Sequence, residues 1–270
     1  TPQTISGQLK LLEESVGETL FNRVGRGLVM TETGHMVYQY ADEIFTLGAE
    51  LTSRVKTGRV IVPALLAVGV VNSIPKLVAS RILQPVLRSE IPIRLVCREG
   101  GLESLLGDLA VHQLDLVLSD RPIPSGLSVK AFSHALGSSK IAFFVRKANA
   151  RQYEKGFPRS LDKAPILLPT IDNPIRRAID AWFDGQGISP ALVAEFEDSA
   201  LMKAFGEAGN GIFPAPAAIA EEVEHMYHCR CIGPAIDVEE NYYAISPERK
   251  LKHPAVLKII ATAKSDLLSC

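Results

Sequence analysis

The sequence predicts an α/β protein in which a short helix-and-hairpin unit and one long helix precede a larger region of alternating strands and helices. Three observations predict this order. An amphipathic helical pattern opens the chain, and a glycine-bounded hairpin pattern follows it. A second helical pattern then runs without proline from 31 to 55. After Thr57-Gly58-Arg59 the apolar residues gather in short runs that are separated by further helical patterns.

The composition is that of a globular chain without net basic character. The 270 residues carry 29 Lys and Arg against 30 Asp and Glu, so a general nucleic-acid coat is excluded and any DNA contact must be local. The length suits about two domains. Because the sequence shows no signal-like leader and no apolar run of about 18 residues, we expect a cytoplasmic protein without a membrane partner. The four cysteines are too scattered for the disulfide framework of a secreted protein.

The opening stretch TPQTISGQLKLLEESVG predicts a helix with clear ends. Thr1 is placed to cap the first turn, Pro2 occupies a position that tolerates proline, and Gly17 stands where a helix commonly stops. A buried stripe is predicted by apolar residues at helical spacing, at Ile5, Leu9, Leu12 and Val16. The other face carries short polar side chains and one cation that can approach base edges and phosphates, at Gln3, Thr4, Ser6, Gly7 and Lys10. An ordinary solvated helix face is the alternative.

The next segment, LFNRVGRGLVM, predicts a β-hairpin. Two short apolar runs, Leu20 to Val24 and Leu28 to Met30, flank Gly25-Arg26-Gly27, whose glycines permit the positive φ of a tight turn. Arg23 and Arg26 therefore lie at or beside the tip. Cations on a hairpin beside a polar helix suit a winged helix-turn-helix, in which the helix enters the major groove and the wing contacts backbone phosphates.

Together these elements resemble the DNA-binding domain of LysR-type transcriptional regulators. The resemblance rests on the polar helix start, the run LEESVGETLFNR and the T-x-x-G start of the following helix, which match the second half of that domain. It implies promoter contacts by seven residues, Thr1, Gln3, Thr4, Ser6, Lys10, Arg23 and Arg26. It also implies a fragment, because the family's first helix and most of its second would precede Thr1. We therefore expect this piece alone to bind DNA poorly.

The segment from Thr31 to Val55 predicts one long helix with Thr31 as its N-cap. Apolar residues recur at spacings of three and four, close to the seam of a coiled coil, at Val37, Tyr40, Ile44, Leu47, Leu51 and Val55. We interpret this helix as a linker that pairs two chains, with a core helix as the alternative. The resemblance implies a homodimer or homotetramer, which would present two recognition helices to a two-fold-related DNA site.

From about 59 onward, apolar runs alternate with helical patterns. Most runs are apolar throughout, which predicts buried strands in largely parallel sheets, at 65–71, 93–97, 114–118, 141–145, 166–168, 191–196 and 211–213. Helices are expected between them at 74–88, 101–112, 174–186, 199–208 and 216–226.

The family resemblance implies more than periodicity shows, namely two Rossmann-like subdomains of the periplasmic-binding-protein type with a cleft between them. It divides the chain into a partial winged helix-turn-helix at 1–30, a linker helix at 31–58, effector subdomain I at 59–134 plus 236–270, and effector subdomain II at 135–235.

Two helix starts that directly follow strands form the candidate effector site. Asn72-Ser73-Ile74-Pro75 follows one strand and Ile171-Asp172-Asn173-Pro174 another, each with capping residues before a proline. Ligands of open α/β sheets bind at the carboxyl ends of strands, and helix N-termini favour anions. Plain capping is the alternative. The resemblance implies effector contacts at these points, by Asn72, Ser73, Asp172 and Asn173, with Asn210 in a nearby turn.

Within the family the chain is similar to regulators of sodium/proton antiporter genes. Four segments carry this similarity: LLAVGVVNSIPKL at 65–77, HQLDLVLSDRPI at 112–123, EFEDSALMKAFGEAGNGIF at 195–213 and HPAVLKI at 253–259. It implies a transcriptional activator that works with RNA polymerase and answers Na⁺ or Li⁺, with raised pH as a candidate second input. Alkali cations want oxygen ligands. Asp172 with nearby carbonyls suits that need, but the sequence does not locate the site.

No other chemistry is well supported by the sequence. Four metal-ligand side chains lie within seven residues, at His225, His228, Cys229 and Cys231, but their spacing matches no standard zinc site and a buried strand is the alternative. The common nucleotide-binding and hydrolase motifs are absent, so we expect neither an enzyme nor a cofactor apart from the effector. A two-lobed small-molecule binding protein is the alternative function, and the first 58 residues argue against it.

Overall fold

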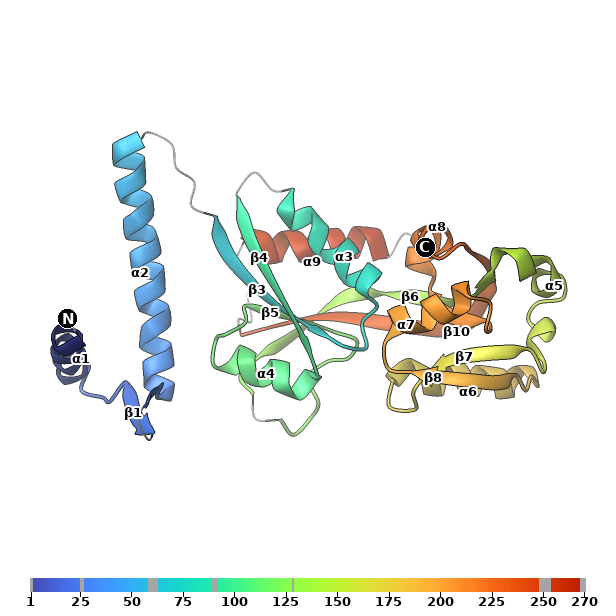
Figure 1. Ribbon diagram of the computed structural model, residues 1–270, viewed down its shortest axis with the longest axis horizontal. Helices are drawn as coiled ribbons and strands as arrows, with labels where there is room; N and C mark the ends of the chain where they lie inside the picture. Colours follow the sequence, from blue (N-terminus) through green and yellow to red (C-terminus); the bar gives the residue numbers. More distant parts are fainter. Residues whose placement is uncertain are drawn as a thin grey trace.

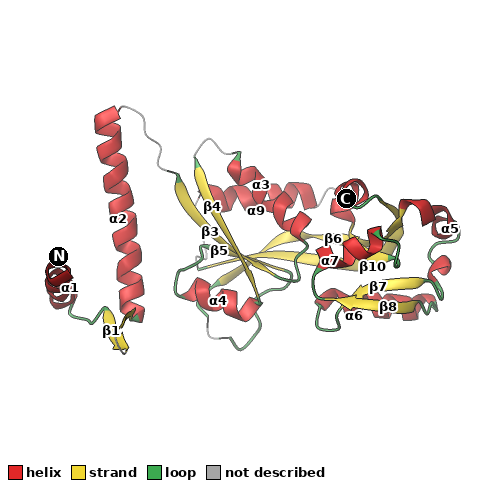
Figure 2. Cartoon of the chain, viewed as in Figure 1, coloured by secondary structure: helices red, strands yellow, loops and turns green. Residues whose placement is uncertain are grey.

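A computed structural model of the chain describes residues 2–24, 27–57, 63–88, 92–127, 129–247 and 254–267. The described residues form an N-terminal unit and a larger α/β region (Figures 1 and 2). The N-terminal unit contains α1 (Pro2–Val16), β1 (Phe21–Val24), β2 (Gly27–Met30) and α2 (Glu32–Thr57). The strands of the α/β region are β3 (Ala64–Val71), β4 (Ile93–Gly100), β5 (Leu116–Ser119), β6 (Phe132–Arg146), β7 (Pro165–Pro169), β8 (Ala191–Phe196), β9 (Phe213–Pro216) and β10 (Cys229–Ser246). Its helices are α3 (Lys76–Leu87), α4 (Leu102–Ala110), α5 (Ala150–Glu154), α6 (Pro174–Gln186), α7 (Ser199–Glu207), α8 (Ala220–Met226) and α9 (Pro254–Leu267), with three short 3₁₀ turns.

The end of α1 fixes the start of the hairpin. Gly17 has a φ of +79° and its amide donates to the Glu13 carbonyl at 2.8 Å, which confirms the predicted helix stop. The Glu13 carboxylate accepts hydrogen bonds from the amides of Leu20 at 2.7 Å and Phe21 at 3.2 Å. β1 and β2 then pair antiparallel with Val24 opposite Gly27, as predicted. Glu13 therefore holds the helix and the hairpin together.

The start of α2 is built against the same segment. The Thr31 hydroxyl accepts the Gly34 amide at 2.9 Å, so the predicted N-cap is confirmed, and it donates to the Thr19 carbonyl at 2.7 Å. A Cβ on Gly34 would lie 2.1 Å from the Leu20 carbonyl oxygen. Only glycine allows this approach, which explains the T-x-x-G pattern physically.

The buried stripe predicted for α1 is wrong for the described residues. Ile5 is 61% exposed, Leu12 and Val16 are also exposed, and Leu9 is half-buried. The spacing places these side chains on one face, but no element in the described part of the chain covers that face. Burial requires a partner surface, which periodicity alone does not supply.

The main sheet of the α/β region is mixed rather than largely parallel. Its six strands lie in the order β4-β3-β5-β10-β6-β9. β4, β3 and β5 are parallel, whereas β10 and β6 run antiparallel to their neighbours, and a separate parallel pair is formed by β7 and β8. The prediction of largely parallel sheets was wrong because the 18-residue strand β10 and the first half of β6 were missed. The strand expected at 211–213 is shifted to β9, and the helix expected at 216–226 begins as a 3₁₀ turn before α8.

β6 and β10 connect two lobes (Figure 1). Lobe I contains β3–β5, α3, α4 and α9, and lobe II contains β7–β9 and α5–α8. β10 pairs with β5 near its end, at Tyr243 to Ile245, and with β6 along most of its length, with a register shift between Ala235 and Glu239. That irregularity lies beside the predicted subdomain boundary at 236, whose exact position stays a prediction.

In each lobe, helices pack on both faces of the sheet. In lobe I, Leu66, Val68 and Val70 face α3 and α9, whereas Val71 packs against α4. In lobe II, α6 packs with Ile141 and Phe143 of β6 in a core of its own. The core under α3 and α9 continues into lobe II through residues of β6, α7 and β9. No helix in the described residues is both long and apolar enough to cross a membrane.

Candidate nucleic-acid interface and effector cleft

The outward face of α1 is the candidate nucleic-acid interface. Thr4, Ser6 and Lys10 are exposed on this helix, and Arg23 is exposed on β1. Lys10 lies 3.9 Å from the Glu14 carboxylate, an exposed pair that leaves the ammonium available to phosphates. Thr1 and Arg26 lie outside the described residues, and so does the side chain of Gln3. The contacts that Glu13 makes keep the helix and the hairpin side by side, which is the geometry that DNA contact by both elements needs.

The predicted seam of α2 is exposed where its side chains are described. Tyr40, Ile44 and Leu51 are each more than 60% exposed, and Val37 is half-buried. The side chains of Leu47 and Val55 lie outside the described part. A row of large apolar side chains exposed on one helix is typical of a protein interface, so the pairing role stays a prediction that this exposure favours.

A small cavity of about 30 Å³ lies where the two lobes meet. Ser73 and Pro75 line it from lobe I, and Glu240 lines it from β10. Lobe II contributes the ends of β7 and β9 and the starts of α6 and α7, through Pro169, Asn173, Ile175, Ser199, Met202, Lys203, Pro214, Ala215 and Pro216, and Ile141 of β6 completes the lining. The carboxyl ends of β3 and β7 therefore meet at one point, as ligand sites of α/β sheets do.

Two of the five predicted effector residues line this cavity. Ser73 and Asn173 do so, whereas Asn72, Asp172 and Asn210 are exposed and stand outside its lining. The effector role of all five stays a prediction.

The two helix starts differ in how they are capped. Asn173 caps α6, because its side chain accepts the Ile175 amide at 3.1 Å. α3 begins after Pro75 without any side-chain cap bond, so the expected capping by Asn72 or Ser73 is wrong. The Ser73 hydroxyl oxygen is instead buried without a hydrogen-bond partner in the described residues. A buried hydroxyl in that condition is available to a ligand.

The buried side chains Glu240 and Lys203 line the cavity, and the buried side chains Tyr242 and Asp120 act on Glu240. The Glu240 carboxylate accepts the Tyr242 hydroxyl at 2.6 Å, and the Lys203 ammonium donates to the Ser199 carbonyl at 3.1 Å. Asp120 follows β5, and its side chain is 3% exposed. Its only ion pair among the described residues is with the Arg121 Nε at 3.4 Å, and neither carboxylate oxygen accepts a hydrogen bond there.

These groups perturb one another. The pKa of Glu240 is raised to about 7, chiefly by burial and also by the Asp120 charge, while the Tyr242 hydrogen bond and the Lys203 charge oppose this rise. Burial lowers the pKa of Lys203 to about 8, and Glu240 and Asp198 oppose that change. Burial also raises the pKa of Tyr242 well above its usual value, so its hydroxyl remains a donor. The cluster therefore changes charge between neutral and mildly alkaline pH.

Sequence reasoning missed Asp120, Lys203 and Glu240 as site residues. Asp120 follows a buried strand in the same way as Ser73 follows β3, so the rule that selected Ser73 was sufficient to find it. Lys203 stands between apolar residues in the run LMKAF, and Glu240 stands in a strand that was itself missed. A charge inside an apolar run is the signal that these positions offered.

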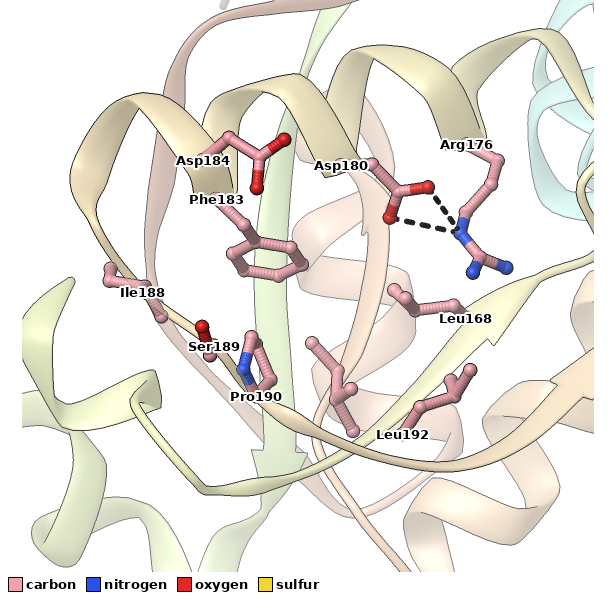
Figure 3. A pocket seen from close by; sticks show the side chains of 10 residues that line it. Leu168, Arg176, Asp180, Phe183, Asp184, Ile188, Ser189, Pro190 and Leu192 are labelled. Carbon is pink, nitrogen blue, oxygen red and sulfur yellow. Dashed lines mark hydrogen bonds and ion pairs between the residues drawn. The ribbon is translucent and has the colours of Figure 1, made fainter.

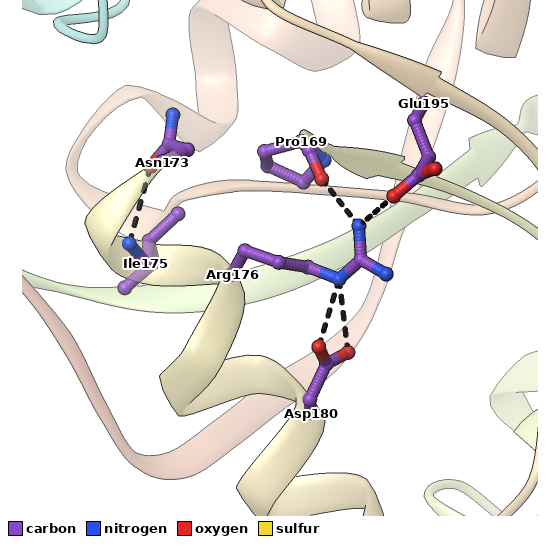
Figure 4. Close-up of polar contacts among 6 residues, drawn as sticks. All are labelled: Pro169, Asn173, Ile175, Arg176, Asp180 and Glu195. Atoms are coloured by element: carbon purple, nitrogen blue, oxygen red, sulfur yellow. Dashed lines mark hydrogen bonds and ion pairs between the residues drawn. The ribbon is translucent and has the colours of Figure 1, made fainter. Parts of the chain in front are cut away.

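A second, larger cavity lies between α6 and the strand pair β7–β8 (Figure 3). Its main polar groups are already paired: the Arg176 Nε donates to both Asp180 oxygens, at 3.0 and 2.9 Å. Another guanidinium nitrogen donates to the Pro169 carbonyl at 2.6 Å and to Glu195 (Figure 4). This network ties α6 to β7 and β8. We therefore assign a structural role to the Arg176 cluster.

The histidine and cysteine group is not arranged as a metal site. His228 is exposed and its Nδ1 lies 2.9 Å from Glu207, whereas Cys229 is buried. Burial raises the pKa of Cys229 to about 12, which disfavours the thiolate that binds metals. The described residues contain no group of three His, Cys, Asp or Glu side chains placed to hold a metal ion.

Family comparisons match both parts of the chain. The family described as "Bacterial regulatory helix-turn-helix protein, lysR family" matches residues 1–35, and the "LysR substrate binding domain" matches residues 63–267. The chain belongs to the LysR family. The LysR assignment confirms the predicted fold class, a partial winged helix-turn-helix followed by a two-lobed effector region of the periplasmic-binding-protein type.

Individual LysR proteins extend this likeness over the whole chain. The chain is 39% identical over 269 residues to the transcriptional activator protein NhaR of Escherichia coli (strain K12), covering 100% of this chain and 88% of that protein. Among solved structures it is similar to CbnR, a LysR family transcriptional regulator, with a TM-score of 0.62 at 18% identity over 96% of this chain and 89% of CbnR. CbnR in complex with its target DNA gives a TM-score of 0.59 at 17% identity, over 97% of this chain and 89% of CbnR. These two structures support the fold alone.

Proposed function

We propose that this chain belongs to a cytoplasmic transcriptional activator of sodium/proton antiporter genes, whose effector region responds to Na⁺ or Li⁺. The observation that carries this proposal is the 39% identity to an NhaR activator along the full chain. The relatives are named as regulators, and we propose no enzymatic activity for the chain.

The DNA contact is made by α1 and the hairpin. Gln3, Thr4, Ser6 and Lys10, with Thr1 before them, approach base edges and neighbouring phosphates in the major groove, because short polar side chains can reach the groove floor. Arg23 and Arg26 contact phosphates from the wing. Since the chain carries a net charge of −1, attraction to DNA depends on local cations such as these.

The exposed row on α2 pairs the chain with a second copy. Tyr40, Ile44 and Leu51 are too large and too exposed to remain solvated on a stable monomer, and a partner helix would bury them. A homodimer, or a homotetramer built from two such dimers, presents two copies of α1 to a two-fold-related operator. Contact with RNA polymerase then gives activation.

The effector acts at the cavity between the lobes. A ligand that touches Ser73 from lobe I and Asn173 from lobe II binds one relative placement of the lobes better than another, and so shifts the equilibrium between them. That shift changes the spacing of the paired DNA-binding units. Coupling of this kind requires the effector and the DNA to influence each other's affinity reciprocally.

The test is a binding titration of the full-length protein against DNA from the promoter beside its own gene. Fluorescence anisotropy compares that promoter fragment with a scrambled fragment of equal length at fixed ionic strength. We expect the promoter to bind at least about 10³-fold more tightly. Equal affinity for the two fragments would contradict a regulator and favour the alternative, a two-lobed small-molecule binding protein.

A further inference from the structure

We propose that the outer end of lobe II is a second, sequence-independent contact for promoter DNA, formed by five exposed cations that we call the basic tip: Lys147, Arg151, Lys155, Arg159 and Lys163. The inference rests on the proposed function and extends the DNA contact beyond α1 and the hairpin. The basic tip belongs to the 3₁₀ turn η1 (Lys147–Asn149), to α5, to the 3₁₀ turn η2 (Arg159–Leu161) and to the residues that follow them. α5 lies at the end of lobe II that points away from lobe I (Figure 1).

Positive charge is concentrated in this segment. Residues 146–163 contain six Lys or Arg and two Asp or Glu, so they carry a formal charge of +4 in a chain whose net charge is −1. Lys147, Arg151 and Lys155 are four residues apart along the helical run of η1 and α5, a spacing that places them on one face. All five cations of the basic tip are exposed.

The carboxylates of the same segment are engaged with other partners. The Glu154 carboxylate lies 3.4 Å from the Arg230 Nε, and an Asp162 carboxylate oxygen accepts the Ser189 amide at 2.9 Å. In the part of the chain that the structure describes, no ion pair joins a cation of the basic tip to a carboxylate. The positive charge of the basic tip is therefore available to an anionic partner.

The backbone beneath the basic tip is held by packing. Tyr153 of α5 and Leu161 of η2 are buried in the core of lobe II, and the Ser160 hydroxyl donates to the Tyr153 carbonyl at 2.6 Å. The ring centroid of Phe157 lies 6.1 Å from that of Trp182 on α6. Because the backbone is already fixed, a partner of the basic tip has less chain to order on binding.

The chemistry of this surface matches a phosphate backbone better than a protein. No large apolar side chain is exposed between residues 146 and 163, all of which the structure describes. Protein interfaces gather aromatic and apolar groups at their centre and are depleted in Lys, whereas protein–DNA interfaces are much more positively charged. Phosphate contacts carry no sequence information, so the basic tip adds affinity without adding specificity.

The phosphates that the basic tip contacts flank the bases that α1 reads, since α2 and lobe I separate the two surfaces along the chain. The experiment therefore compares two DNA lengths in anisotropy titrations of the full-length protein over a range of KCl concentrations. The short fragment is the shortest piece of promoter that the protein still prefers to scrambled DNA of equal length. The long fragment adds about 20 bp of scrambled sequence, two helical turns, on each side.

We expect the unmodified protein to bind the long fragment at least about tenfold more tightly than the short one. The log–log salt slope should be steeper by about 0.9 for each additional phosphate contacted. The basic-tip variant carries Lys147→Gln, Arg151→Gln and Lys155→Gln together. It should lose both differences and bind the short fragment as the unmodified protein does.

The matched control carries Arg88→Gln, Lys130→Gln and Arg177→Gln, which remove three exposed cations outside the basic tip. It should keep both differences, and melting temperatures check that both variants fold. No gain on the long fragment by the unmodified protein, or equal losses in the two variants, would overturn the DNA contact. Unchanged DNA binding by the basic-tip variant with reduced transcription by RNA polymerase would also overturn it, in favour of an acidic protein surface. If promoter and scrambled DNA of equal length bind equally, the proposed function fails, whereas a loss confined to the basic-tip variant on that DNA still supports the contact.

Discussion

The Tyr242 hydroxyl donates to the Glu240 carboxylate across 2.6 Å, inside the strand that connects the two lobes. Both residues are buried, and the Glu240 side chain also lines the cavity at the lobe junction. A titratable group in that position lies both at the cavity and on a strand that the two lobes share.

Glu240 makes stability depend on pH. Because its pKa is raised from 4.5 to about 7 in the folded protein, the folded state holds a proton that the unfolded state loses, and stability should fall as pH rises from about 4.5 to about 7. The pKa of Lys203 is lowered from 10.5 to about 8, so the unfolded state holds a proton that the folded state has lost. Stability should therefore rise again as pH increases from about 8 to about 10.5. Urea unfolding of Glu240→Gln should lack the first fall, which is on the order of 3 kcal/mol for a pKa raised from 4.5 to about 7. An unchanged pH profile in Glu240→Gln would show that another group causes it.

Arg176 holds lobe II together. Its guanidinium joins Asp180 of α6 to the Pro169 carbonyl at the end of β7 and to Glu195 of β8. Lysine keeps the charge but lacks the planar fork, so Arg176→Lys should cost about 2 kcal/mol in urea unfolding. Arg177→Lys on the exposed side of α6 is the control and should change stability by less than about 0.5 kcal/mol. If Arg176→Lys and Arg177→Lys change stability by equally small amounts, the Arg176 network does not stabilise lobe II.

Gly34 sets the placement of α2 against the hairpin. Gly34→Ala forces a Cβ to within 2.1 Å of the Leu20 carbonyl oxygen, so the helix must shift from the wing. We expect promoter affinity of the full-length protein to fall about tenfold or more, since such overpacking costs about 1–3 kcal/mol. Gly48→Ala, on the same helix with nothing within 4 Å, should leave affinity unchanged and favour the helix. Loss of affinity in both variants would point to a general effect of α2.

Mutations should distinguish the residues that contact base edges from those that contact phosphates. Ser6→Ala or Gln3→Ala should cost about 1–3 kcal/mol on promoter DNA and much less on scrambled DNA, because base-edge contacts carry the specificity. Arg23→Ala or Arg26→Ala should weaken binding to both DNAs and reduce the salt slope by about one. Anisotropy titrations over a range of KCl concentrations measure both quantities. Equal losses on the two DNAs for all four variants would refute these roles.

Local signals in the sequence predicted local structure well. The Thr31 and Asn173 caps, the Gly17 stop and the hairpin each depend on a few adjacent residues, and the structure has them as expected. β10 was missed because Gly233-Pro234 and a charged stretch at 237–240 interrupt its apolar alternation. Its strand character comes from pairing with β6, about a hundred residues earlier, which no local pattern contains.

The candidate site was predicted in part for the same reason. Ser73 and Asn173 follow strands and precede helices, so general rules for α/β sheets select them. Lys203 and Glu240 belong to different elements, and only the packing of α7 against β6 and the course of β10 bring them to one cavity. Burial of a charge is a property of the tertiary fold, and it decides the chemistry of this floor.

The most direct test of a cation-responsive regulator is the affinity of the full-length protein for its own promoter in NaCl and in KCl at equal ionic strength. Equal ionic strength is essential, because counterion release weakens DNA binding in any salt. We predict that the two anisotropy curves differ in affinity or in bound-state anisotropy at pH 8.5 and approach each other at pH 6.0. Curves that superimpose at both pH values while promoter binding is tight would contradict control of DNA binding by the cation.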